Sequence, residues 1–253
     1  MLVALLSDEG YEGFEESGSA LLAYIPVNLF DRERLDEVVS SCQLRYTIST
    51  IPDTNWNAVW ESNFQPVAVE DFCVVHAAFH HDFPRATHEI LITPKMSFGT
   101  GHHATTFMMI RQMKDIAFEH TTVLDFGTGT GVLAILAERL GASKVLAIDN
   151  DEWSIANAAE NLAGNQTRNI VLKQADTAAA DDSFDVILAN ITLNVILDNF
   201  HLFLQQLARG GTLLLSGLLE ADEPMIMEQA KAQKLQLQKK LVQDNWISLR
   251  FQK

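Results

Sequence analysis

The segment TVLDFGTGTG at residues 122–131, followed by VLAID at 145–149, is the most informative part of the chain. An apolar run ends on Asp125 and then breaks into three alternating glycines. Because glycine has no Cβ, such a loop turns tightly and lets its backbone approach a ligand. The next residues, VLAILAERL, have helical spacing, so the loop joins a strand to a helix. A second strand ends on Asp149, which is placed to hold sugar hydroxyls. Together these segments indicate a pocket for a nucleoside-containing cofactor.

The spacing of the glycines narrows the class of cofactor. A dinucleotide loop reads G-x-G-x-x-G and needs a small residue three places after Gly129, but Val132 stands there. The loop reads D-x-G-x-G-x-G instead, which resembles motif I of the seven-stranded S-adenosylmethionine-dependent methyltransferases. The resemblance implies that Gly127 and Gly129 wrap the methionine part of the cofactor and that Asp149 takes both ribose hydroxyls. The alternative is a glycine-rich turn without a ligand.

The composition indicates a globular protein. The chain has 253 residues, 47% hydrophobic and 20% charged, enough for one large domain or for an ordinary domain with a smaller companion. No apolar run approaches the roughly 20 residues that span a bilayer, and the opening MLVALLSDEG lacks the basic flank of a signal peptide. Cys42 and Cys73 form no spaced cluster, which suggests a reducing compartment. We therefore expect a cytoplasmic protein without a membrane partner.

The net charge of -15 is concentrated in the first third of the chain. Residues 1–85 carry 14 acidic and 4 basic side chains, whereas residues 86–253 carry 19 and 14. Direct binding to nucleic acid is disfavoured, because phosphate contacts need Lys and Arg gathered on one face. An acidic surface attracts a basic partner. The alternative is a solvated face that serves solubility alone.

From residue 89 onward, apolar strand patterns and helical patterns alternate, which predicts an α/β fold with helices on both faces of a parallel sheet. The expected strands are 89–93, 122–126, 145–149, 170–174, 184–189 and 211–216, and the expected helices are about 103–117, 131–140, 152–163, 194–208 and 221–233. The C-terminal stretch turns at Asp244-Asn245 between two strand-like runs, which predicts a closing antiparallel hairpin. The resemblance to the methyltransferase class implies such a reversed last strand.

Residues 1–76 are predicted to form a separate, small α+β domain of the ferredoxin-like type that recognises the substrate. Its expected strands lie near 12–17, 20–25, 44–50 and 66–76, and its helix near 31–41. We expect residues 77–90 to be the linker and residues 91–253 to be a seven-stranded Rossmann-like class I methyltransferase domain. Met1 to Glu9 already reads as an amphipathic helix, whereas ferredoxin-like domains usually open with a strand. Either that strand is missing or the natural start lies upstream of Met1.

The segment ITPKMSFGTGHHATT, residues 92–106, narrows the resemblance to one family. Its F-G-T-G-x-H-x-T-T pattern before a motif-I loop resembles the ribosomal protein L11 methyltransferases (the PrmA family), which usually read F-G-T-G-T-H-P-T-T. The chain departs from this pattern at His102 and Ala104. We expect Phe98, Gly99 and Thr106 to line the cofactor site. No metal site is expected, because adjacent histidines point apart and no Cys or carboxylate cluster accompanies them.

The segment FDVILANIT, residues 184–192, contains the candidate catalytic residue. A buried strand ends on Asn190, at the sheet edge where open α/β folds bind ligands. The family pattern is A-N-I-L, and the resemblance implies that the Asn190 side chain and a nearby backbone carbonyl hold the attacking amine. Thr192 stands where the family has Leu. Release-factor glutamine methyltransferases would show N-P-P-Y here and are disfavoured. The alternative role of Asn190 is to cap the following helix.

Two further features have weaker support. Related methyltransferases have an acidic residue that receives the adenine amino group where this chain has Asp176, although an Asp in this position can also cap a helix. Trp56, Trp60 and Phe64 recur at intervals of four, giving an aromatic stripe on one helical face. The stripe resembles the region that follows the recognition domain in the PrmA family, and we favour a role in the core of the small domain.

The resemblance implies an S-adenosylmethionine-dependent protein N-methyltransferase that modifies lysine and N-terminal amines of the large-subunit ribosomal protein L11. The acidic first domain would hold this basic protein, and the enzyme is expected to act as a monomer. Thr106, Gly127, Asp149 and Asn190 would form the cofactor and reaction site. Since no general base stands out, we expect water to accept the amine proton while Asn190 aims the lone pair.

Three alternatives remain from the sequence. The chain could methylate another protein or a small-molecule amine, although a small-molecule enzyme has no reason to join the F-G-T-G segment to an acidic domain. A dehydrogenase would bind nicotinamide, which Val132 argues against. A cofactor-binding module without turnover is kept open by the altered A-N-I-T pattern and by the missing opening strand.

Overall fold

The computed structural model divides into two compact units, Met1–Trp60 and Glu61–Lys253. It describes residues 2–18, 20–51, 64–95, 97–179 and 182–253. The smaller unit has one hydrophobic cluster and the larger unit has two. Among the described residues, no helix is both long enough and apolar enough to cross a bilayer.

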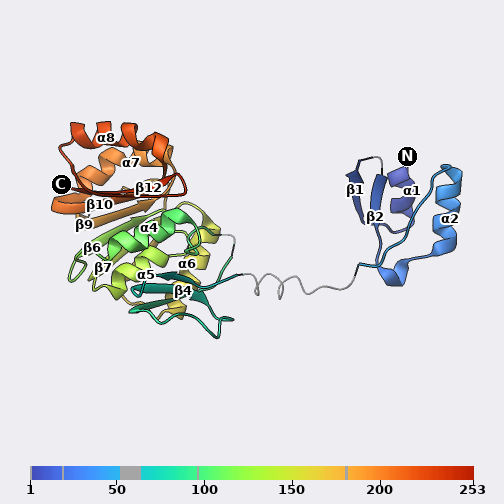
Figure 1. The fold of residues 1–253 in the computed structure, drawn as a ribbon, viewed down its shortest axis with the longest axis horizontal. Helices are drawn as coiled ribbons and strands as arrows, with labels where there is room; N and C mark the ends of the chain where they lie inside the picture. Colours follow the sequence, from blue (N-terminus) through green and yellow to red (C-terminus); the bar gives the residue numbers. More distant parts are fainter. Residues whose placement is uncertain (1, 19, 52–63, 96, 180–181) are drawn as a thin grey trace. The chain divides into compact units, whose positions relative to one another are not determined.

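The smaller unit is a β-hairpin with two helices (Figure 1). Its elements are α1 (Leu2–Asp8), β1 (Gly13–Ser17), β2 (Ala20–Tyr24), the short 3-10 helix η1 (Val27–Leu29) and α2 (Arg32–Ser41). The two strands and both helices agree with the predictions. Asp31 begins α2, because its side chain accepts hydrogen bonds from the backbone N–H groups of Glu33 and Arg34. The predicted strand at 44–50 is wrong: the structure describes this segment and assigns it no helix or strand.

The larger unit is built on a seven-stranded sheet with the order β11-β12-β10-β9-β6-β7-β8, which confirms the predicted architecture. The strands are β6 (Thr122–Phe126), β7 (Lys144–Asp149), β8 (Ile170–Gln174), β9 (Phe184–Asn190), β10 (Leu207–Leu219), β11 (Gln236–Gln243) and β12 (Trp246–Gln252). Strands β6 to β10 are parallel, and β12 runs antiparallel to β10 and β11. The predicted closing hairpin is confirmed, with positive φ at both Asp244 and Asn245 as a two-residue hairpin turn requires.

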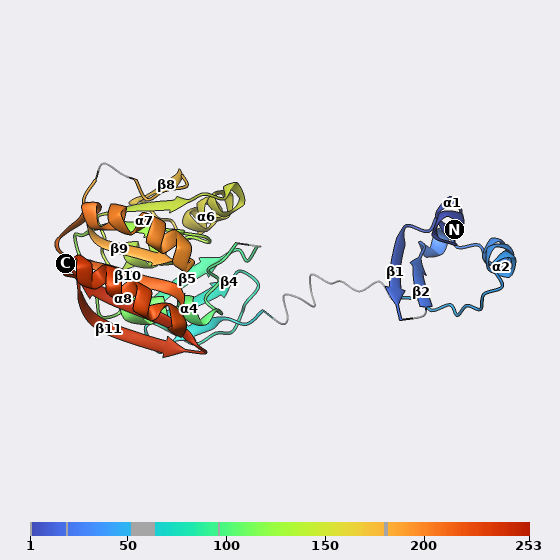
Figure 2. The same cartoon turned by 90° about the horizontal axis from the view of Figure 1, so that it is seen from above.

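Helices cover both faces of this sheet. The helices are α4 (Ala104–Met113), α5 (Val132–Arg139), α6 (Glu152–Gly164), α7 (Leu193–Gln206) and α8 (Glu223–Ala232). Figure 1 shows α7 and α8 on one face and α4 and α5 on the other, and Figure 2 shows the edge strands β8 and β11 on opposite sides. Successive strand residues point to opposite faces, so Val123 joins the core under α4 and α5 while Leu124 joins the core under α7 and α8.

A second sheet of three strands also belongs to the larger unit. It contains β3 (Val67–Val69), β4 (Cys73–Ala77) and β5 (His88–Ile92), with β4 parallel to β5. The boundary between the units therefore falls before the predicted end of the small domain at residue 76. Residues 77–90, predicted as a linker, connect two paired strands of one sheet. The periodicity of single strands carries no information on which sheet they join.

Candidate active site

The predicted site residues meet where the strand order reverses. From β6 the chain proceeds through β7 and β8 toward one edge, and it then returns to β9 and β10 on the other side of β6. The loops after β6 and β9 therefore diverge at the carboxyl edge of neighbouring parallel strands, where open α/β sheets bind ligands. The glycine loop follows β6, and Asn190 ends β9.

The glycine loop has backbone conformations and close contacts that side chains would not tolerate. The φ angles are 77° at Gly127, 55° at Gly129 and 81° at Gly131. A Cβ on Gly129 would lie 2.3 Å from the carbonyl oxygen of Phe98. A Cβ on Gly127 would lie 2.1 Å from the Cγ2 atom of Ile191. The glycines therefore let the loop pack against Phe98 and Ile191 more closely than any side chain would allow.

Phe98 and Gly99 lie directly against this loop. The Thr130 backbone N–H donates to the Phe98 carbonyl over 2.9 Å, and the Thr130 hydroxyl donates to the Gly99 carbonyl over 2.7 Å. The Phe98 ring is half exposed and meets the ring of His103 edge-on, with centroids 5.2 Å apart. The aromatic face of Phe98 is thus accessible beside the glycine loop.

Asp149 adjoins the glycine loop from the end of β7. Its Oδ2 atom accepts a hydrogen bond from the Gly129 N–H over 2.8 Å, and its Oδ1 atom accepts one from the Asp151 N–H over 3.1 Å. A carboxylate offers about four lone-pair positions. Each oxygen of Asp149 therefore keeps the capacity to accept a ligand hydroxyl.

Asn190 is joined to the start of α4. Its Nδ2 atom donates to the Thr106 hydroxyl over 3.2 Å, and its Oδ1 atom is buried without a hydrogen-bond partner among the described residues. Leaving a buried acceptor unsatisfied costs on the order of 1–3 kcal/mol, which indicates a position reserved for a donor. Helix α7 has Thr192 rather than Asn190 as its N-cap, so the alternative role of Asn190 as a cap does not hold.

Asp125 is a buried carboxyl beneath the loop that the sequence analysis did not assign to the site. Burial, with a smaller contribution from the nearby Asp149 charge, raises its pKa to about 7. The Thr128 hydroxyl donates to its Oδ2 atom over 2.6 Å, and its Oδ1 atom has no partner within the described part of the chain. Asp125 is the first residue of the D-x-G-x-G-x-G pattern, and this position could have indicated from the sequence that it belongs to the site.

Asn161 on α6 and Asn165 at its C-cap bind backbone groups of distant segments around the site. Neither residue was predicted from the sequence. The side chain of Asn161 accepts from the Thr93 N–H over 2.7 Å and donates to the Thr130 carbonyl over 2.9 Å. One turn further on, Asn165 bonds to both backbone groups of Leu91. Their spacing of four on a helix was visible in the sequence, but the partners are more than 30 residues away.

The remaining candidates lie outside this cluster of contacts. Asp176 is exposed and lies just beyond β8. No helix starts between Asp176 and residue 179, the last described residue of this segment. The structure therefore does not support a role of Asp176 as a helix cap. Trp56 and Trp60 fall outside the described residues. Phe64 packs against the core of the larger unit and stacks on His80, whereas we had placed it in the small domain.

The two adjacent histidines have structural contacts. The ring of His102 lies 4.6 Å from that of Phe64. His103 is the N-cap of α4, where its Nδ1 atom accepts from the Thr105 N–H. Within the described ranges, no three His, Cys, Asp or Glu side chains are grouped as metal ligands.

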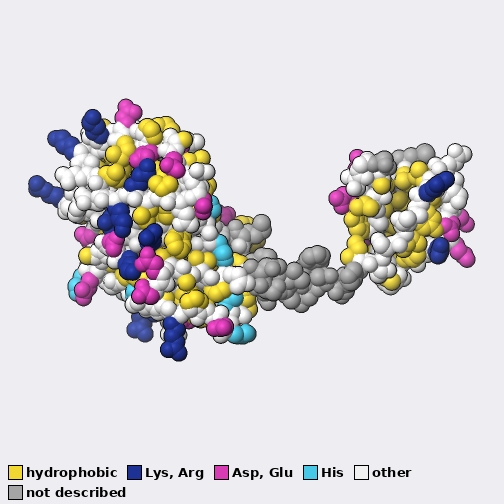
Figure 3. Space-filling view, viewed as in Figure 1, with side chains coloured by type: hydrophobic (Ala, Val, Ile, Leu, Met, Phe, Trp, Pro, Cys, Tyr) yellow, Lys and Arg dark blue, Asp and Glu magenta, His cyan; other side chains and the backbone are white. Residues whose placement is uncertain are grey.

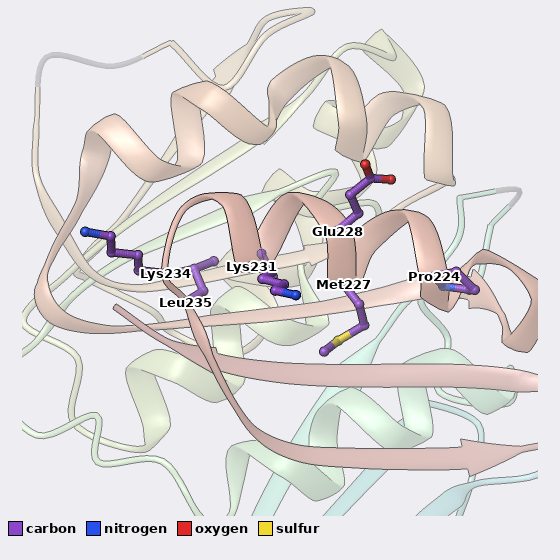
Figure 4. A pocket seen from close by; sticks show the side chains of 7 residues that line it. Pro224, Met227, Glu228, Lys231, Lys234 and Leu235 are labelled. Atoms are coloured by element: carbon purple, nitrogen blue, oxygen red, sulfur yellow. The ribbon is translucent and has the colours of Figure 1, made fainter.

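A cavity of about 550 Å³ lies along α8, away from the predicted residues in sequence (Figure 4). Its lining residues are Pro224, Met227, Glu228, Ala230, Lys231, Lys234 and Leu235. It combines two lysines with one glutamate and contains none of the predicted site residues. The carboxyl ends of β6 and β9, with the loops that follow them, therefore remain the candidate active site.

The sheet order with its antiparallel last strand, and a glycine loop facing an acidic strand end, define the class I S-adenosylmethionine-dependent methyltransferase fold. A solved ribosomal protein L11 methylase from Lactobacillus delbrueckii subsp. bulgaricus is similar, with a TM-score of 0.70, 29% identity, and coverage of 74% of this chain and 98% of that one. A 16S rRNA methyltransferase of T. thermophilus, solved with AdoMet and guanosine, shares the fold at 20% identity, with a TM-score of 0.53 over 62% of this chain and 45% of its own.

Sequence comparison gives the family. The family model "Ribosomal protein L11 methyltransferase (PrmA)" matches residues 11–253. The ribosomal protein L11 methyltransferase of Porphyromonas gingivalis is 42% identical over 99% of this chain and 89% of its own length. The chain belongs to the ribosomal protein L11 methyltransferase (PrmA) family, and it is a methyltransferase.

Proposed function

We propose that this protein transfers methyl groups from S-adenosylmethionine to lysine and N-terminal amines of ribosomal protein L11. The observation that carries the proposal is the Oδ1 atom of Asn190, which is buried without a partner among the described residues at the end of β9, next to the strand that leads into the glycine loop. This oxygen is an acceptor suited to an amine N–H. Family membership supports the choice of substrate.

The residues present fit the cofactor. Gly127 and Gly129 shape the loop that would wrap the methionine part, because side chains at these positions would collide with Ile191 and Phe98. Asp149 would bind the ribose hydroxyls with its spare lone pairs, and Phe98 would cover the cofactor with its exposed ring. Asp176 would receive the adenine amino group. Gly99 would support the glycine loop through its carbonyl, which accepts from the Thr130 hydroxyl. Thr106 would support the side chain of Asn190.

The bound cofactor supplies a methyl group already activated on a sulfonium, so the protein mainly has to orient and desolvate the amine. A lysine ammonium must first lose its proton, and we assign that proton to water. Asn190 Oδ1 would then accept an N–H of the neutral amine and direct its lone pair. Thr106 would keep the amide in this orientation, because it binds the amide nitrogen.

The smaller unit would hold the protein substrate. Residues 1–60 contain 10 acidic and 3 basic side chains. Figure 3 shows hydrophobic side chains in the middle of one face of this unit, with acidic side chains toward its sides and basic ones beside them on the right. Val27 is 75% exposed and Leu29 is 55% exposed. Exposed apolar side chains on a unit with this excess of acidic charge suit a basic protein rather than nucleic acid. We propose a cytoplasmic monomer.

The test is transfer of labelled methyl groups to purified L11 by the full-length protein. Replacing Asn190 by Ala should lower kcat strongly while the Kd of S-adenosylmethionine changes little. The control is Asn199→Ala, which removes another buried amide on α7. It should cost stability but leave transfer near the wild-type rate. Cofactor binding without transfer by the wild-type protein would contradict the proposal and favour a binding module.

A further inference from the structure

Ile191 lies between two glycines from different elements, one against its side chain and the other against its backbone. Gly127, on the loop after β6, meets the Ile191 side chain, where a Cβ would approach Cγ2 to 2.1 Å. Gly217, inside β10, meets the Ile191 backbone itself. Ile191 directly follows Asn190. A shift of the Ile191 backbone therefore also moves the Asn190 side-chain amide, which we propose binds the substrate amine.

Gly217 approaches this backbone unusually closely. Its φ is 82°, and a Cβ built on it would lie 2.3 Å from the Ile191 oxygen, 2.7 Å from its carbonyl carbon and 2.8 Å from its nitrogen. The approach is made where β10 changes register against β12, between Leu215 and Leu218. In addition, the Ile191 N–H donates to the Ser216 carbonyl over 3.2 Å.

We propose that Gly217 is a positioning residue for methyl transfer, which holds the Ile191 carbonyl and the Asn190 amide in the geometry that receives the amine. This inference rests on the proposed function. Gly217 would act through the backbone of Ile191, the group nearest to the position that a Cβ would occupy, rather than through a contact assigned above to the cofactor or the amine. A side chain here would have to push Ile191 away by about 0.7 Å to restore a tolerable contact of 3.0 Å.

The same strand provides a matched control. Gly210 also lies in β10 with a similar φ of 78°, but a Cβ there meets no atom within 4 Å among the described residues. Gly210→Ala and Gly217→Ala thus introduce the same methyl group and similar backbone strain. They differ in the collision with Ile191.

The experiment compares both variants with the wild-type protein in methyl transfer to L11 at saturating substrates. Gly217→Ala is expected to lower kcat by about 100-fold, since a misplacement near 1 Å has effects of this size. The Kd of S-adenosylmethionine is expected to stay within about threefold, because Asp149, the proposed ribose ligand, keeps its hydrogen bond to the Gly129 N–H. The fraction of incompletely methylated product should also rise. Gly210→Ala should keep the wild-type kcat and product distribution.

Equal kcat values for Gly217→Ala and wild type, or equal losses in the two variants, would overturn the inference while the proposed function stands. No transfer to L11 by the wild type would instead refute the proposed function. If Gly217→Ala does not fold, hydrogen exchange of the wild-type protein tests whether the Ile191 backbone is held in place. The Ile191 amide should then exchange as slowly as the amides of β9, and rapid exchange would contradict a fixed backbone.

Discussion

The amide of Asn190 donates to the hydroxyl of Thr106 over 3.2 Å, across 84 residues of sequence. This contact fixes which end of the amide remains free, because the nitrogen is used and the buried oxygen is not. It also joins β9 to the first turn of α4. The orientation of the Asn190 amide is therefore set by Thr106, a residue of the distant segment that contains the FGTG pattern.

Removing this hydroxyl should impair orientation more than cofactor binding. Thr106→Val is expected to lower kcat about tenfold, since the Asn190 amide loses the partner that selects its rotamer. Thr106→Ser retains the hydroxyl and should keep most of the rate. Steady-state kinetics with cofactor titration by calorimetry measures both effects. A Val variant with an unchanged kcat would show that the contact does not orient Asn190.

Asp149 should control cofactor affinity. Asp149→Ala removes the acceptor of the Gly129 N–H and the proposed ribose ligand, and hydrogen bonds to charged groups are worth about 1.5–3 kcal/mol each. The Kd of S-adenosylmethionine is therefore expected to rise about 10- to 100-fold. Asp151→Ala serves as control: it removes the N-cap of α6, which costs about 1 kcal/mol of stability, without this rise in Kd. Similar Kd values for the two variants would contradict the assignment.

Asp125 should make the stability of the cofactor-free protein fall with rising pH. Burial raises its folded-state pKa from 3.8 to about 7, so the folded protein binds more protons than the unfolded chain between these values and loses stability as pH increases. Relative to wild type, Asp125→Asn should gain melting temperature from pH 4 to pH 7. Thermal scans across this range measure the difference. A difference that does not depend on pH would refute the raised pKa.

Because Asn161 bridges two loops of the site, its removal should lower both the stability of the protein and its affinity for the cofactor. Asn161→Ala leaves the Thr93 N–H and the Thr130 carbonyl without their partner, and each unsatisfied buried group costs about 1–3 kcal/mol. We expect a lower melting temperature together with a weaker affinity for S-adenosylmethionine, which excess cofactor partly offsets. A lower melting temperature with unaltered cofactor affinity would mean that the two loops do not depend on this bridge.

Sequence patterns predicted the elements of the larger unit because each element bears its own signal. The apolar run of β6, the glycines after it and the Asp244-Asn245 turn are all local. The strand predicted at 44–50 failed because a strand also needs a partner. The pairing of β4 with β5, which moved the boundary between the units, depends on contacts between segments distant in sequence.

For the candidate site, too, the sequence indicated the individual residues but not the contacts between them. Phe98, Gly127, Gly129, Asp149 and Asn190 belong to motifs and were named from the sequence. Their connections were not visible there: the Thr106 contact of Asn190, the bridge made by Asn161 and the close approach of Gly217 all join separate segments. Positive φ and close approach identify Gly217 only once the backbone of Ile191 is placed beside it.

The most direct test of the central claim is the intact mass of ribosomal protein L11 after incubation with S-adenosylmethionine and the full-length protein. Our account predicts a mass increase in whole methyl increments with the wild-type and Asn199→Ala proteins, and little or none with Asn190→Ala. An unchanged mass with folded, cofactor-binding wild-type protein would contradict it. An equal increase with Asn190→Ala would contradict the role of the Asn190 oxygen.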